Sequence, residues 1–134
     1  MGFDMYRTVD EGYFRLNIWA MGDAMRWMFE YEMMHTEVRP YESINDMFSK
    51  LFNEKGEKAA LRWGPEVPGI ASWKFSSNDG WLVTPIESKS AIDIWESADS
   101  PVPRHSDGVE CSWWPEWIEY LRKSVELSSD FAVW

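Results

Sequence analysis

The sequence predicts an α+β protein in which about four helices pack around a small sheet, formed by short strands from the N-terminus, the middle loop and the C-terminus. Three observations favour this class. Apolar and polar residues alternate near both ends, apolar residues recur every three or four positions between them, and turn or helix-cap signals separate these segments. The 134 residues are enough for one core, so residues 1–134 are expected to form a single domain.

The first half of the chain predicts one strand and two helices. Residues 3–9, FDMYRTV, alternate in polarity and indicate a strand. The apolar spacing from 13 to 34 indicates a helix that Asp10 could cap, and its apolar flanks make it the expected centre of the fold. An amphipathic pattern that starts near Ser43 and extends toward Trp63, with an interruption at NEKGEK, predicts a second helix.

The second half predicts two further helices and a final strand. Thr84 and Glu87, with Pro85 between them, form a capping-box pattern that starts a helix running to about Ala98. A fourth helix is expected to start at Ser112. Its apolar face contains Trp114, Trp117, Ile118 and Leu121. The last residues, DFAVW, predict a strand that pairs with the opening strand.

The charge of the chain favours a basic partner. The net charge is −10, and the part from 76 to 134 holds 11 acidic against 4 basic residues, a net of −7. No cluster of Lys and Arg is present that could neutralise a phosphate backbone, so direct binding of nucleic acid is not expected. Partners with a basic surface fit better, and one variant is mimicry of the negative charge of a nucleic acid.

The sequence predicts a cytoplasmic protein without a membrane partner. Cys111 is the only cysteine, which rules out an internal disulfide. The first residues, MGFDMYRTVDEG, lack the basic and then apolar pattern of a secretory signal. No run approaches the roughly 18 apolar residues that a membrane span requires.

Metal binding and catalysis have little support in the sequence. The only histidines, His35 and His105, lie far apart, and neither they nor Cys111 fall in a metal-ligand spacing, so no metal and no cofactor is expected. Cys111 with His105 matches no nucleophile signature, and a lone cysteine beside SWW is more typical of a buried apolar residue. Gly-rich phosphate loops are absent from the sequence.

The segment from Ser76 to Glu87, SSNDGWLVTPIE, has two interpretations. Asn78 and Asp79 precede a glycine in a pattern typical of a tight turn between two strands that leads into the capped helix. The same polar side chains beside Trp73 and Trp81 could instead form a small-molecule pocket, with Asp79 or Glu87 as an acid or base. Turn and cap rules explain every residue without a ligand, so the first interpretation is preferred.

The aromatic content is unusually high, with 10 Trp, 5 Tyr and 7 Phe, so some of these rings are expected to be exposed. In the segment CSWWPEW, Trp114 and Trp117 share one side of a helix, whereas Trp113 must point elsewhere because neighbouring residues are about 100° apart. Trp113 is then either a lid over the preceding Pro-containing loop or an anchor for a partner.

Several segments together resemble an uncharacterised family of small acidic proteins from actinobacteriophages and actinobacterial genomes. They are MGFDMY, YFRLN, GPEVPGI, KFSSNDGWLVTPIE and WWPEWIEYL, and the PGI…KFxSNDGWxVTP pattern is the most specific. Relatives in that family commonly carry an insertion before YFRLN that is nearly absent here. The resemblance implies a phage or prophage accessory protein in the host bacterial cytoplasm, and it supplies no catalytic residues.

The sequence therefore predicts an accessory protein that binds a host or phage protein through an acidic surface bearing aromatic side chains. The candidate binding residues are Trp73, Asn78, Asp79, Trp81, Trp113 and Trp114. A small-molecule-binding protein or enzyme that uses the Ser76–Trp81 turn pocket is the alternative from another class. A homo-oligomer that buries aromatic side chains between copies is a third interpretation.

Overall fold

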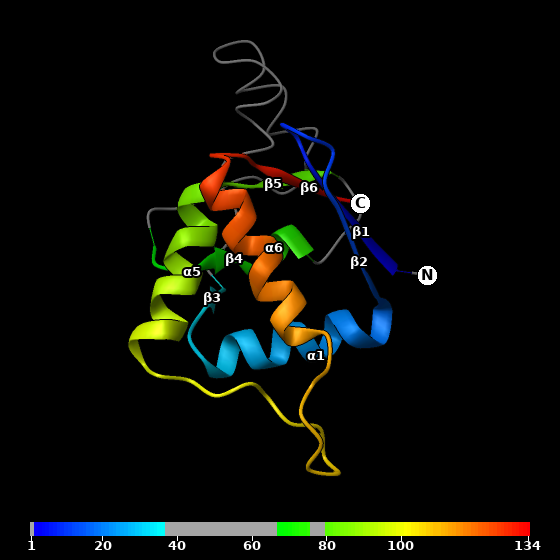
Figure 1. Ribbon diagram of the computed structural model, residues 1–134, viewed down its shortest axis with the longest axis vertical. Helices are drawn as coiled ribbons and strands as arrows, with labels where there is room; N and C mark the ends of the chain where they lie inside the picture. Colours follow the sequence, from blue (N-terminus) through cyan, green and yellow to red (C-terminus); the bar gives the residue numbers. More distant parts are fainter. Residues whose placement is uncertain (1, 37–66, 76–79) are drawn as a thin grey trace.

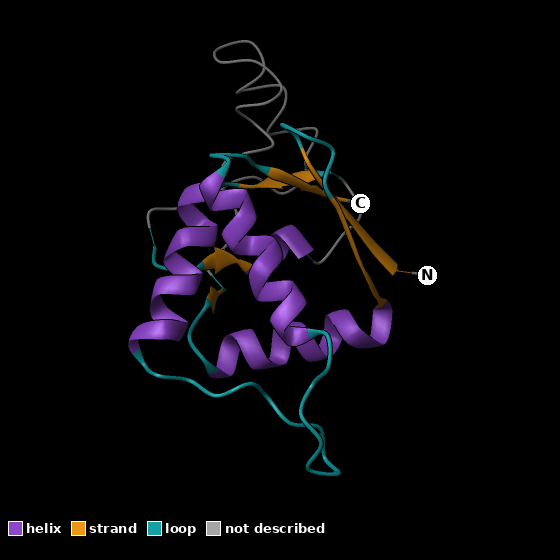
Figure 2. Ribbon diagram, viewed as in Figure 1, coloured by secondary structure: helices purple, strands orange, loops and turns teal. Residues whose placement is uncertain are grey.

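The computed structural model describes residues 2–36, 67–75 and 80–134. These residues form three α-helices, a four-stranded antiparallel sheet, a two-stranded parallel pair and one 3₁₀ helix (Figure 1). Figure 2 shows the helices gathered on one side of the larger sheet. In chain order the elements are β1 (Gly2–Arg7), β2 (Tyr13–Asn17), α1 (Ile18–Glu30), β3 (Met34–His35), β4 (Ile70–Ala71), η2 (Ser72–Phe75), β5 (Trp81–Val83), α5 (Pro85–Ser97), α6 (Trp114–Glu126) and β6 (Phe131–Val133).

The larger sheet joins the two ends of the described chain. Its strand order is β2-β1-β6-β5, and each neighbouring pair is antiparallel. Asp4 and Trp134 exchange backbone hydrogen bonds of 2.8 Å in both directions, and Met5 lies opposite Val133. The prediction that the DFAVW segment pairs with the opening strand is confirmed.

Buried and exposed side chains alternate along the strands, so the larger sheet has one buried face and one exposed face. The inward side chains pack beneath the helices, and they include Met5, Leu16, Val83, Phe131 and Val133, all buried. Tyr6 and Tyr13 face the other way, lie opposite each other on β1 and β2, and have ring centroids 5.0 Å apart. Since side chains of a strand point alternately to the two faces, this pattern fixes the register of the whole sheet.

The prediction of about four helices around one small sheet is wrong in two respects. The described residues form three α-helices, and the helix predicted from near Ser43 lies outside them. The strands form two sheets, because β3 and β4 pair in parallel, away from the four-stranded sheet. The broader assignment to the α+β class is consistent with the structure.

The predicted helix from 13 to 34 is also wrong at its start and its end. Residues 13–17 form β2, and the helix begins at Ile18, because the side chain of Asn17 accepts a 2.8 Å hydrogen bond from the Ala20 amide and caps it. Asp10 is not the cap. Its carboxylate binds Arg7 in the turn between β1 and β2. The segment YFRLN alternates in polarity, and that signal was masked by the helical spacing of the residues around it.

The helix signals in the second half are largely confirmed. Thr84 and Glu87 form a complete capping box at the start of α5, with Pro85 as its first residue. Helix α6 begins at Trp114 rather than at Ser112, and the residue before it, Trp113, makes no side-chain cap bond. The predicted apolar face is buried as expected, and it consists of Trp114, Trp117, Ile118 and Leu121.

The core is rich in aromatic rings, yet some rings remain outside it. Trp81, Trp114 and Trp117 are fully buried, whereas the side chain of Trp19 is 82% exposed and that of Trp134 is 51% exposed. This agrees with the expectation that the core could not cover all the aromatic side chains. Among the described helices, none has the length and apolar character needed to cross a membrane.

Candidate functional site

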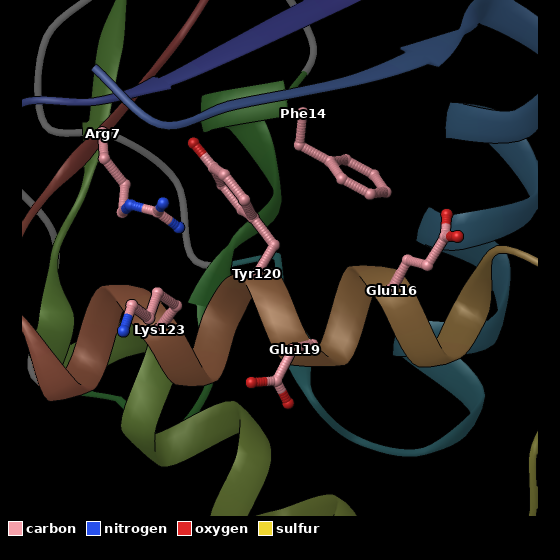
Figure 3. A pocket seen from close by; sticks show the side chains of 6 residues that line it. All are labelled: Arg7, Phe14, Glu116, Glu119, Tyr120 and Lys123. Carbon is pink, nitrogen blue, oxygen red and sulfur yellow. The ribbon is translucent and has the colours of Figure 1, made fainter. Parts of the chain in front are cut away.

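A cavity of about 470 Å³ lies between β2 and the exposed side of α6 (Figure 3). Residues from the two ends of the chain line it together, because the sheet and α6 bring those ends side by side. The lining residues are Arg7, Phe14, Glu116, Glu119, Tyr120 and Lys123. Positions 116, 120 and 123 fall on one side of α6, since residues four and seven apart share a helix face.

Aromatic rings form the floor of this cavity. Phe14 points inward from β2, and its ring centroid lies 5.5 Å from that of Tyr120 and 5.7 Å from that of Trp117. The rings of Trp117 and Tyr120 are nearly parallel, at 12°, and Phe131 contacts both of them from below. This packing holds the floor in one conformation and makes its surface apolar.

The hydroxyl of Tyr120 takes part in a hydrogen bond that stabilises the fold. It donates a 2.8 Å hydrogen bond to the carbonyl oxygen of Gly12, in the turn between β1 and β2. Burial raises the pKa of Tyr120 well above its usual value, so the phenol stays protonated at neutral pH. Tyr120 therefore positions the turn and offers its ring to the cavity, and it is unsuited to act as a base.

Arg7 supplies a cation whose charge is neutralised locally. Its guanidinium lies 4.9 Å from the centre of the Tyr120 ring and forms hydrogen bonds of 2.9 and 3.2 Å with the carboxylate of Asp10. These bonds, together with one from the Gly12 amide, hold the pKa of Asp10 below its usual value. The Arg7–Asp10 pair closes one end of the cavity without leaving a free charge there.

Two glutamates on the rim carry the uncompensated charge of the site. Within the described part of the chain, Glu116 and Glu119 form no ion pair, whereas Lys123 lies 3.6 Å from Glu126. Figure 3 shows Glu116 beyond Phe14, and the carboxylate of Glu119 points away from the Tyr120 ring. An apolar floor under free carboxylates is suited to a cationic side chain with an aliphatic stem, such as Lys or Arg.

A second, smaller cavity of about 210 Å³ lies on the other side of Glu119. Its lining residues are Trp95, Val102, Trp114, Pro115, Ile118, Glu119 and Arg122. Arg122 is paired with Glu96, so its charge is neutralised. The indole N–H groups of Trp95 and Trp114 have no acceptor among the described residues. Glu119 therefore stands between two hollows on the same helix, and each hollow has aromatic lining.

The structure separates the predicted binding residues into two pairs. Trp113 is half-buried against Trp27, with ring centroids 5.9 Å apart, and Trp114 is fully buried behind it. Trp73 and Trp81 lie 4.8 Å apart in an edge-to-face arrangement, and Trp81 is fully buried. Trp113 therefore packs against the core instead of protruding from it.

The predicted turn pocket can be followed only at its flanks, because Asn78 and Asp79 lie outside the described residues. On the C-terminal flank, one carboxylate oxygen of Glu87 lies 2.5 Å from Nζ of Lys74 and accepts from the Thr84 amide, and the other accepts from the Ala71 amide. Burial lowers the pKa of Lys74, against the opposing effect of the Glu87 charge. These contacts occupy Glu87 in the fold, and they account for it without a ligand.

Cys111 and His105 are the remaining chemical candidates. Cys111 is buried, and burial raises the pKa of its thiol, which is the wrong direction for a nucleophile. His105 packs its ring 5.4 Å from that of Trp27. In the ranges that the structure describes, no three His, Cys, Asp or Glu side chains come together as metal ligands.

Comparison of the chain with family models, curated proteins and solved structures gave no match. The cavity itself was missed in the sequence. Arg7 and Phe14 belong to segments read only as a strand and a helix, and Tyr120 was not singled out. The available signal was the spacing of Glu116, Glu119 and Lys123, which places charged residues along the solvent side of an otherwise Trp-rich helix.

Proposed function

We propose that this protein is an accessory binding protein that uses two glutamates of α6, Glu116 and Glu119, to hold a partner protein through a basic side chain. The observation that carries the proposal is the pair of glutamates, Glu116 and Glu119, which form no ion pair with any residue that the structure describes and which border a cavity floored by Phe14 and Tyr120. A Lys or Arg of the partner would place its stem on the aromatic floor and its charge near the carboxylate of Glu116, while Glu119 adds negative charge on the adjacent side of the helix (Figure 3).

The charge of the whole chain supports the same class of partner. A net charge of −10 attracts basic surfaces over distances comparable with the Debye length, about 8 Å at physiological ionic strength. Such attraction speeds encounter, whereas the cavity selects the side chain that stays bound. We therefore expect the association rate to fall steeply when salt is added.

The biological setting that we propose follows from the sequence resemblance. An accessory protein of an actinobacteriophage or prophage would act in the host bacterial cytoplasm, on a host or phage protein with a basic surface. The turn pocket near Ser76–Trp81 gains no comparable support, because the contacts of Glu87 account for its carboxylate within the fold.

The test is the binding of a lysine-rich peptide to matched charge variants. The probe is a capped heptapeptide of alternating Thr and Lys, titrated by calorimetry, with a Thr/Glu peptide as the negative control. We expect the double variant Glu116→Gln, Glu119→Gln to weaken binding by about tenfold, since each partly exposed ion pair contributes up to about 1 kcal/mol.

The control variant makes the same change of net charge elsewhere. Glu30 and Glu32 are exposed near the C-terminal end of α1, and their double replacement by Gln should change the affinity by less than about twofold. Equal weakening by both double variants would show that only the net charge matters, and the proposed site would then be wrong.

A further inference from the structure

Strand β2 is the edge of the four-stranded sheet on the side of the cavity. Phe14 belongs to both features, because its side chain points inward from β2 and lines the cavity. An edge strand presents unpaired backbone groups in a row, and these are a template for a further strand.

The hydrogen-bond pattern shows which groups of β2 are free. The Arg7 amide donates to the Gly12 carbonyl at 2.8 Å, and β1 contacts β6 through Asp4. In an antiparallel ladder the two sides of a strand alternate, so Phe14 and Leu16 bond to β1, and Tyr13 and Arg15 face outward. The N–H and C=O groups of Tyr13 and Arg15 have no hydrogen-bond partner among the described residues.

Two of the usual protections against strand pairing, a proline and an inward-pointing charge, are missing from this edge. Between Tyr13 and Asn17 there is no proline, and no charged side chain points inward. The one charged residue of the strand, Arg15, faces the exposed side and is held by Asp4 at 2.7 Å. Tyr13 donates to the same carboxylate at 2.5 Å. Both outward residues are thus fixed in position, with their backbone groups directed away from the sheet.

We propose that β2 receives an extended basic segment of the partner protein as a fifth, antiparallel strand, whose inward side chains enter the cavity beside α6. This inference rests on the proposed function and specifies how the partner is held. An antiparallel strand continues the pattern of this sheet, in which all neighbouring strands run antiparallel.

The register of the sheet places the incoming side chains. One inward row runs from Trp81 through Val133 and Met5 to Phe14. A fifth strand would extend this row by about 4.8 Å beyond Phe14, on the side where Glu116 and Glu119 border the cavity. A Lys or Arg at that position would approach the carboxylate of Glu116, the glutamate beside Phe14 (Figure 3), and alternate residues would lie beside Tyr13 and Arg15 on the outer face.

The charge of the chain favours a basic segment over a second copy of the chain as the strand that pairs with β2. Pairing of β2 with β2 of another copy would bring two chains of net charge −10 together and would place the same glutamates on both sides of the junction. A basic segment instead brings the opposite charge to Glu116 and Glu119. The glutamates beside the cavity and the net charge of the chain therefore favour a basic segment over a second copy.

The first test removes one backbone donor. Because the Arg15 amide is not used within the sheet, Arg15→Pro deletes that donor and keeps the β1–β2 ladder, and an outward-facing N–H on an edge strand is a position where proline is tolerated. The matched control, Arg15→Ala, loses the same side chain and keeps the amide. We expect R15P to bind the Thr/Lys heptapeptide about tenfold more weakly than R15A.

The second test leaves the protein unchanged, so it holds even if R15P fails to fold. In an antiparallel fifth strand, residues whose amides face β2 have outward side chains, and the inward lysines have amides that face solvent. N-methylation of the central Thr residues of the heptapeptide should therefore weaken binding at least tenfold, whereas N-methylation of the Lys residues should change it by less than about threefold.

Each outcome supports or overturns a stated part of the proposal. Equal binding by R15P and R15A, together with no effect of Thr methylation, would overturn the edge docking. If E116Q/E119Q still weakened binding in that case, the proposed function would stand without the fifth strand. If R15P instead dissociated a dimer seen by analytical ultracentrifugation in the wild type, the edge would be occupied by a second copy, and the proposal would again be wrong.

Discussion

The buried ion pair between Lys74 and Glu87 allows a stability prediction with a magnitude. The Lys74 side chain is fully buried, the Glu87 side chain is 13% exposed, and Nζ lies 2.5 Å from the carboxylate oxygen. At an effective dielectric constant of about 20, two unit charges at this separation attract by about 7 kcal/mol. Glu87→Gln removes that attraction and leaves a buried cation.

The net loss is smaller than the attraction, for two reasons. A neutral glutamine costs less to bury than a carboxylate, and its amide oxygen can still accept from Lys74. In addition, the charge of Asp130 favours the lysine cation. We therefore expect Glu87→Gln to lower the free energy of unfolding by about 3 kcal/mol, the lower end of what removal of one partner of a buried pair costs.

The lowered pKa of Lys74 predicts how the stability of the protein changes with pH. Burial lowers the folded-state pKa of Lys74 below 10.5, so the unfolded chain binds more protons between the folded-state value and 10.5. Stability must then rise with pH in that window. The Glu87 charge raises the folded-state pKa of Lys74, so Glu87→Gln lowers that pKa further. The pH range over which stability rises is then wider in the variant. The variant should therefore recover part of its stability at about pH 9.5.

The assay is urea denaturation followed by tryptophan fluorescence at about pH 7 and about pH 9.5. Glu96→Gln is the matched control, because it removes the same charge from the exposed Arg122–Glu96 pair on neighbouring helices, where a loss below about 1 kcal/mol is expected. A Glu87→Gln variant no less stable than Glu96→Gln at about pH 7, or one whose loss of stability grew at about pH 9.5, would refute the reasoning.

Three further substitutions test local features of the fold by the same urea denaturation. Gly80 has a φ of 79°, and a Cβ there would lie 2.5 Å from Cζ2 of Trp134, so Gly80→Ala should cost about 1–3 kcal/mol; an unchanged midpoint would contradict this. Gly22 lies inside α1 with no atom near its Cβ position, so Gly22→Ala should add about 0.5–1 kcal/mol, and a loss would show a hidden contact. Asn17→Ala should cost about 1 kcal/mol, because the Ala20 amide loses its cap, and a cost near zero would mean that water replaces it.

The features that the sequence predicted correctly depend on residues close together in the chain. The capping box uses Thr84 and Glu87, three positions apart, and the buried face of α6 follows from a helical repeat within eight residues. Such patterns can be read locally, because the geometry of a helix fixes which neighbours meet. The pairing of the terminal strands was predictable for a different reason, since two short alternating segments in a small domain need partners.

The errors arose where two local patterns overlapped or where contacts were distant. Phe14 and Ile18 fit a helical repeat with the residues after them, yet Phe14 belongs to a strand. The helix begins only after Asn17, because the side chain of Asn17 caps it there. Lys74 gave no sign of burial in the sequence, because its partner Glu87 lies across a turn. The cavity joins Arg7 and Phe14 to α6 over about a hundred residues of chain, and single-sequence patterns do not report such contacts.

Because several tryptophans are buried, the binding proposal depends on ion pairs and backbone hydrogen bonds more than on contacts with aromatic side chains. Trp81 and Trp114 are buried, so the binding proposal rests on Glu116, Glu119 and the edge strand β2 rather than on these two rings. These two contributions respond differently to salt. Ion pairs at the rim are screened when the ionic strength rises, and backbone hydrogen bonds in a ladder are not. The salt dependence of binding of the Thr/Lys heptapeptide should therefore be smaller in E116Q/E119Q than in R15P, because the first variant removes the ion pairs at the rim and the second keeps them.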